Sequence, residues 1–130
     1  MNFRNALLIL IIGALAAQSA IAQIAQGDKA YNRMAFAEAT SYYEHGLKKD
    51  TANYAAWSKL ADCYRRNGDA RNAERAYAKV IKGNGGSSND QYFHILMLLQ
   101  NTRYAEAKNE IIEFKSKNTG DTRIEAVGRR

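Results

Sequence analysis

The sequence has 130 residues, which is enough for one domain. It contains a single cysteine, so no disulfide can form within the chain and the fold must be held by packing. The formal net charge is +6, but the basic residues are spread along the chain rather than gathered in a block. This favours a solvated basic surface and argues against nucleic acid as a partner.

The first 22 residues are expected to be a secretory signal peptide that is not part of the fold. A short polar start with one arginine precedes an apolar run at residues 6–17, and Ala20-Ile21-Ala22 then supplies small residues two positions apart. The sequence therefore predicts cleavage before Gln23, with a cut before Gln18 as the second choice. The protein is expected to be periplasmic or otherwise exported.

A retained membrane anchor is the alternative to cleavage. The apolar run has 12 residues, whereas a helix needs about 20 to cross a bilayer, so membrane contact is expected to be peripheral at most. A lipid anchor would require a cysteine at the cut site, and the single cysteine is Cys63. The chain is therefore not expected to be a lipoprotein.

A short block of residues recurs along the chain. Residues 36–39 (Phe-Ala-Glu-Ala) return 68 positions later as residues 104–107 (Tyr-Ala-Glu-Ala), and residues 70–73 stand halfway between them. Each block ends in an alanine, so the period is 34. Such a period indicates two-helix units, which stack because one pair cannot cover its own apolar stripe.

The expected helices follow this repeat in chain order. They cover about residues 24–33, 36–49, 54–66, 70–82, 90–100 and 104–117. The predicted fold is all-α, with three antiparallel helix pairs in a short right-handed solenoid. The repeat domain spans residues 23–117, in units of about 20–53, 54–87 and 88–117, and residues 118–130 are expected to be a tail or linker.

The middle unit carries the clearest pattern. Its first helix, turn and second helix contain Trp57, Leu60, Ala61, Tyr64, Gly68, Ala73 and Tyr77. This resembles the W-x2-L-G-x2-Y and A-x3-F pattern of tetratricopeptide (TPR) repeats. The match predicts that Trp57 and Tyr77 are largely buried. The chain departs from the pattern in having no proline, the residue with which such repeats often end.

A narrower resemblance concerns residues 60–65 (Leu-Ala-Asp-Cys-Tyr-Arg), the Gly-Asp at 68–69 and residues 104–108. They are similar to OmpA-family envelope proteins of Bacteroidota, which include a periplasmic component of the type IX secretion system. In that group a signal peptide and a short TPR stack precede a β-propeller-like domain and a peptidoglycan-binding OmpA-like domain. Neither later domain occurs in these 130 residues, so peptidoglycan binding is not carried over. The chain is either part of a longer member or a stand-alone stack.

Two candidate binding surfaces follow from the repeat. In TPR stacks the first helices line a groove in which ligands usually lie, and the polar residues there in the middle unit are Lys59, Asp62, Arg65 and Arg66. Any helix has a polar face, so position alone makes them candidates. The arrangement by which some relatives clamp a C-terminal carboxylate is missing, because Ile24 and Asp28 stand where its lysine and asparagine would be.

The second surface is an apolar docking patch of Tyr92, Phe93, Leu96 and Leu99. With the His94 ring counted as aromatic, eight of the ten residues from 90 to 99 are apolar or aromatic, which is more than one packing face can absorb. An exposed apolar patch usually marks an interface. The patch is expected to be covered either by the same polypeptide, through its tail or a following domain, or by a separate protein.

The sequence predicts a non-enzymatic scaffold for protein–protein interaction in the periplasm or cell envelope. Its partners are expected to be envelope proteins or a following domain, and a secretion or outer-membrane assembly is one setting. The alternative is a basic peripheral binder of cell wall or membrane surface. No catalytic residues, cofactor, metal ligands or small-molecule substrate are expected, because no catalytic constellation or ligand spacing is present.

Overall fold

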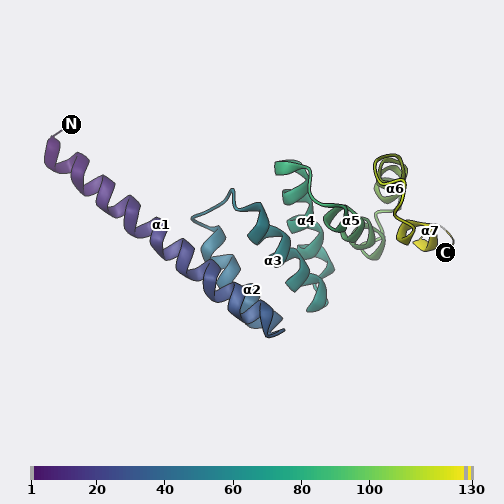
Figure 1. The fold of residues 1–130 in the computed structure, drawn as a ribbon, viewed down its shortest axis with the longest axis horizontal. Helices are drawn as coiled ribbons and strands as arrows, with labels where there is room; N and C mark the ends of the chain where they lie inside the picture. Colours follow the sequence, from purple (N-terminus) through teal and green to yellow (C-terminus); the bar gives the residue numbers. More distant parts are fainter. Residues whose placement is uncertain (1, 128, 130) are drawn as a thin grey trace.

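The computed structural model describes residues 2–127 and 129, in which there are seven α-helices and no strand. The helices are α1 (Phe3–Asn32), α2 (Phe36–Leu47), α3 (Tyr54–Arg66), α4 (Ala70–Asn84), α5 (Ser88–Gln100), α6 (Tyr104–Lys117) and α7 (Arg123–Val127). The first six pack on their neighbours in chain order, and Figure 1 shows them following one another along the long axis of the molecule. The expected all-α repeat of three helix pairs is confirmed, with α1–α2, α3–α4 and α5–α6 as the pairs.

The two helices of each pair are joined by the same backbone turn. Met34, Gly68 and Thr102 lie 34 residues apart, and each has a positive φ between 62° and 81°. In each turn the amide of the next residue donates to a carbonyl five positions earlier, at 2.8–2.9 Å. Because left-handed backbone favours glycine, the middle unit has the least strained turn of the three.

The core is a row of three clusters rather than a single centre. The first consists of Ala30, Ala39, Tyr43, Leu47, Ala56, Leu60 and Cys63. The second consists of Ala61, Ala73, Ala76, Tyr77 and Met97, and the third of Ile95, Phe114 and Ile124. The repeat alanines Ala39, Ala73 and Ala107 are all fully buried, because each lies where two helices approach closely.

The two aromatic side chains expected to be buried in the middle unit differ. Tyr77 is 2% exposed, and Trp57 is buried less completely. The indole lies against both the first and second clusters, and its Nε1 donates to the Thr51 carbonyl at 3.0 Å. That bond keeps the indole at the edge of the stack, where it is partly exposed and still packs on two clusters.

Helix α1 begins much earlier than the sequence predicted. The first helix of the stack was expected from about residue 24, whereas α1 runs without a break from Phe3 through the expected signal peptide. Its buried residues are Ala20, Gly27 and Ala30, while most of the apolar side chains before them are exposed. Figure 1 shows this N-terminal part projecting beyond α2.

The length of α1 bears on the membrane question. By length and composition α1 can cross a membrane. The 12-residue apolar run taken alone had predicted a segment too short to do so. A signal sequence passes the same test. The helix therefore fits both a cleaved signal and a retained anchor.

The segment expected as a tail or linker contributes a packed turn of helix. Ile124 of α7 is 1% exposed and lies in the third cluster with Ile95 and Phe114. The Arg123 guanidinium lies 4.5 Å from the centre of the Tyr92 ring, and its Nη1 donates to Asn89 Oδ1 at 2.7 Å. Cover by the tail was one of the two expectations for the patch around Tyr92, but a helix in the tail was not predicted, because five residues are too few to show a period.

Candidate functional site: the groove along the first helices

The first helices of the three units, α1, α3 and α5, share one cavity of about 250 Å³. Its walls are formed by Tyr31, Ser58, Lys59, Asp62, Arg65, Arg66, Asn89, Asp90 and Phe93, with Tyr77 of α4 between them. All four groove residues named from the sequence line this cavity. The structure therefore brings the predicted residues together in one place.

Asp62 is the centre of the hydrogen bonding in the groove. Its Oδ2 accepts from the Tyr31 hydroxyl and from Arg66 Nε, both at 2.7 Å, and its Oδ1 accepts from Arg65 Nη2. Burial raises the pKa of the Asp62 carboxyl, but these hydrogen bonds outweigh it and hold the pKa below its usual value. Burial and Asp62 together raise the pKa of Tyr31 to about 12.

Lys59 joins the first two units. Its Nζ donates to Asp28 Oδ1 at 2.7 Å, and the hydroxyl of Tyr43 donates to the same oxygen at 2.7 Å. Burial raises the pKa of Asp28, whereas these donors lower it more, so the carboxyl stays below its ordinary pKa. The basic side chains predicted for the groove are therefore each paired with an acid of the chain itself.

Asp90 closes the groove at the start of α5. It is buried and accepts from the amide and the hydroxyl of Ser87, at 2.8 and 2.7 Å, and from the hydroxyl of Ser58. Ser87 and Asp90 form a capping box, in which each side chain bonds the backbone of the other residue. The sequence reasoning missed Asp90, although a serine three positions before an acid signals this cap.

Phe93 lies on a different face from the one predicted. It was grouped with the apolar docking patch, but its ring lines the groove, where it stacks on Tyr77 with ring centres 6.1 Å apart. The Arg65 guanidinium lies 4.0 Å from the centre of the same ring. Phe93 therefore lines the groove, and its ring also meets the edge of the Tyr92 ring, with ring centres 5.3 Å apart.

The other three patch residues do meet in one place. Tyr92, Leu96 and Leu99 line a second cavity of about 600 Å³, together with Gln100, Tyr104, Ala126 and Val127. All three are half-buried rather than exposed, and α7 of the same chain supplies one wall. The cover expected from the chain's own tail thus exists in part, over the side nearest Ile124.

Cys63 and His94, two side chains with reactive groups, lie outside the groove lining. The thiol of Cys63 is fully buried, and burial raises its pKa to about 11, so it holds its proton at neutral pH. His94 Nδ1 lies 2.7 Å from Glu110 Oε2. Within residues 2–127 and 129 no cluster of three metal-ligating side chains was found.

A prediction follows from the low pKa of Asp62. A carboxyl whose pKa is lower in the folded state stabilises the fold above its unfolded pKa of about 3.9, and this stabilisation is lost as the pH falls through the folded pKa. Asp62→Asn should therefore lower the free energy of unfolding by about 1–3 kcal/mol at pH 7. Urea unfolding at pH 7 and pH 3 should show the wild type and the variant converging at the lower pH. A difference that stays constant across this range would mean that the ionised carboxylate has no such role.

No protein-family model and no curated protein matches the sequence. Solved structures do resemble it. The first TPR domain of Spaghetti (RPAP3), bound to the HSP90 peptide SRMEEVD, is 17% identical and has a TM-score of 0.71, over 85% of this chain and 87% of that one. The second TPR domain of human RPAP3, in complex with the HSP70 peptide SGPTIEEVD, is 18% identical with a TM-score of 0.72, over 85% and 92%.

A third neighbour is YrrB, described as a TPR protein with an unusual peptide-binding site. It is 16% identical, with a TM-score of 0.70 over 81% of this chain and 54% of its own. At such low identities the likeness establishes the fold and nothing more. The chain has the fold of TPR domains.

Proposed function

We propose that this chain is a protein-interaction scaffold whose groove holds an extended segment of a partner protein. The proposal is carried by the groove itself, which combines hydrogen-bonding and aromatic side chains from all three units in one cavity. Structural neighbours with the same fold are described with peptides bound. A groove of this kind suits an extended segment, because side chains along its length meet successive residues of the segment.

A photo-crosslinking amino acid placed at position 89 tests the proposal in cells. Asn89 is exposed and lines the groove, so a bound partner segment should be captured there. The matched control is position 108, because Lys108 is equally exposed on α6 and lines none of the cavities described above. The proposal requires a crosslinked partner at position 89 that is missing at 108. Equal capture at both positions, or capture at 108 alone, would place binding elsewhere.

The second part of the proposal is export to the cell envelope, in the setting of a secretion or outer-membrane assembly. The apolar N-terminal part of α1 and the Ala20-Ile21-Ala22 sequence support it. In the folded chain Ala20 is buried and its carbonyl oxygen lies close to Gly46. A cut before Gln23 would therefore remove a packed residue, whereas a cut before Gln18 would retain it.

N-terminal sequencing of the protein from fractionated cells tests this part. The expected N-terminus is Gln23, in the periplasmic fraction. An intact N-terminus in the membrane fraction would identify α1 as a retained anchor. An intact N-terminus on a cytoplasmic protein would overturn export altogether.

The alternative function, a basic binder of cell wall or membrane surface, has less support at the groove. Lys59, Arg65 and Arg66 are each paired with Asp28 or Asp62, so little uncompensated positive charge remains there. Electrostatic surface binding falls steeply with ionic strength. Retention of the partner through a salt gradient therefore separates the two functions.

A further inference from the structure

The floor of the groove contains two polar atoms that the fold leaves unused. The Tyr77 hydroxyl and Arg65 Nε are buried and make no hydrogen bond of good geometry among the described residues. The two side chains do interact with each other, and the Arg65 guanidinium lowers the pKa of Tyr77 against the larger rise that burial causes. Tyr77 is 2% exposed and lines the cavity from α4, while Arg65 lines it from α3. Buried polar atoms in folded proteins are almost always bonded, so two adjoining exceptions need an explanation.

The repeat shows that the unused hydroxyl is specific to the middle unit. Tyr43 and Tyr77 stand 34 residues apart, as do Asp28 and Asp62. In the first unit the tyrosine donates to the aspartate at 2.7 Å. In the middle unit the equivalent bond is not made, because Asp62 accepts from Tyr31 and from two arginines instead.

Each of the two buried atoms without a well-formed hydrogen bond, Arg65 Nε and the Tyr77 hydroxyl oxygen, carries a hydrogen that it can donate. Asp62 accepts three hydrogen bonds, and Asp90 accepts three from Ser58 and Ser87. A cationic or donor group entering the groove would meet two carboxylates whose oxygens each already accept at least one hydrogen bond. An oxygen acceptor would meet the Tyr77 hydroxyl and a guanidinium N–H beside it. A hydrogen bond from a charged donor to a carboxylate is stronger than one between neutral groups.

Resting on the proposed function, we propose that this part of the groove receives the carboxylate of an acidic side chain on the bound peptide. The carboxylate accepts from Tyr77 and Arg65, and the Phe93 ring borders the methylene stem. Both donors are fixed in advance, because Arg65 is bonded to Asp62 and stacked on Phe93 while Tyr77 is packed in the second cluster. Such preorganisation lowers the entropic cost of binding.

The test titrates the whole chain with two short capped peptides, one with Glu and one with Gln in the middle of a Gly-Ser sequence. Nitrogen-15 NMR follows the Arg65 Nε–H signal, which is assigned as the one missing in Arg65→Lys. The Glu peptide should shift this signal and bind about tenfold more tightly than the Gln peptide. Equal binding of the two peptides, or no shift with the Glu peptide up to about 10 mM, would overturn the proposal.

A matched pair of variants checks the role of the hydroxyl. Tyr77→Phe should weaken binding of the Glu peptide about tenfold, while Tyr43→Phe, at the same repeat position outside the cavity, should leave it unchanged. Thermal stability should respond in the opposite way. Tyr43→Phe loses a bond to Asp28 and should lower the Tm by about 4–8 °C, whereas Tyr77→Phe should not lower it.

Two outcomes would contradict this role of Tyr77. A drop in Tm with Tyr77→Phe as large as that with Tyr43→Phe would mean that the hydroxyl has a partner within the fold. If Tyr77→Phe binds the Glu peptide as tightly as the wild type does, the hydroxyl bonds water and not the peptide carboxylate. Crosslinking at position 89 separates the two proposals. If a partner is captured there but the Glu peptide does not shift the Arg65 Nε–H signal, the scaffold function stands and only the carboxylate site is ruled out.

Discussion

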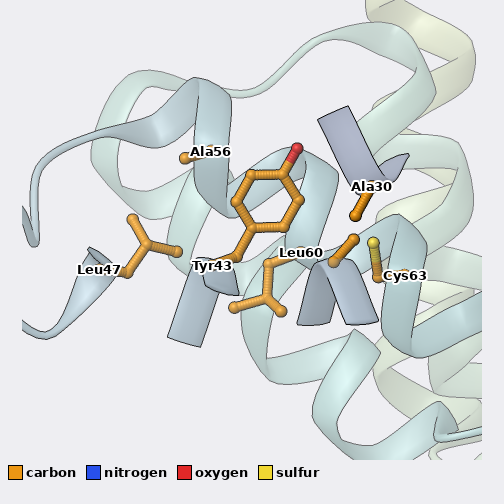
Figure 2. Packing of buried hydrophobic residues seen from close by; sticks show 7 residues of the cluster. Ala30, Tyr43, Leu47, Ala56, Leu60 and Cys63 are labelled. Carbon is orange, nitrogen blue, oxygen red and sulfur yellow. The ribbon is translucent and has the colours of Figure 1, made fainter. Parts of the chain in front are cut away.

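Replacing Tyr43 with Ala should lower the free energy of unfolding by about 3–5 kcal/mol. The side chain is fully excluded from solvent and lies at the centre of the first cluster, as Figure 2 shows. Its ring packs so closely on α1 that a Cβ at Gly27 would come within 2.7 Å of it. The substitution leaves a cavity between α1 and α2 and also removes the hydroxyl that bonds Asp28, so packing and hydrogen bonding are lost together.

Urea unfolding followed by circular dichroism measures this loss. Tyr104→Ala is the matched control, because Tyr104 is 63% exposed and its replacement should cost less than ~0.5 kcal/mol. Similar effects of the two substitutions would mean that α1 is not packed on α2 as described. Since α1 also carries the expected cleavage site, the measurement is best made on the chain as it occurs in the cell.

The sequence predicted the helix pairs well because the repeat imposes the same requirements three times. Ala39, Ala73 and Ala107 could be named as contact residues, since a larger side chain there would separate the two helices of a unit. The turn residues Met34 and Thr102 were less evident. Only the middle unit has a glycine at this position, and the common left-handed backbone becomes visible once the three turns are compared.

The directions of the α5 side chains and the length of α1 are features that the sequence pattern did not predict. Tyr92 and Phe93 were assigned to one patch, and their rings do meet edge to face, although successive residues of a helix point about 100° apart. The structure accordingly directs Tyr92 to the second cavity and Phe93 to the groove. The helical continuation of α1 was not predicted, because a segment treated as a cleaved signal was left out of the fold.

The groove could be located from the sequence, but its internal bonding could not. The position of a residue in the repeat predicts where its Cα atom lies. It does not predict which of several nearby acids a long side chain such as Arg65 or Lys59 will bond. Tyr77 was expected only to fill space, because its repeat position is a packing position. Its unused hydroxyl depends on which donors Asp62 accepts, and that choice emerges only from the full arrangement of side chains.

Phe114→Ala should also lower the free energy of unfolding by about 3–5 kcal/mol. Here the loss should be confined to one end of the chain. Phe114 is 2% exposed and packs with Ile95 and Ile124 in the third cluster, so its loss loosens α6 and α7 from α5. In a linear stack each unit is stabilised by itself and by its nearest neighbours. A loss at the end of the stack should therefore unfold the end before the rest.

Amide hydrogen exchange locates the effect residue by residue. Phe114→Ala should abolish protection in α6 and α7 while the amides of α3 and α4 stay protected, because the second cluster contains no residue of α6 or α7. Ile112→Ala serves as the control on the same helix, since Ile112 is 62% exposed and its replacement should change protection little. Uniform loss of protection from α1 to α6 would contradict this picture and show that the three units unfold as one. In that case a partner bound in the groove would stabilise the whole chain, whereas local unfolding would confine its effect to the units it touches.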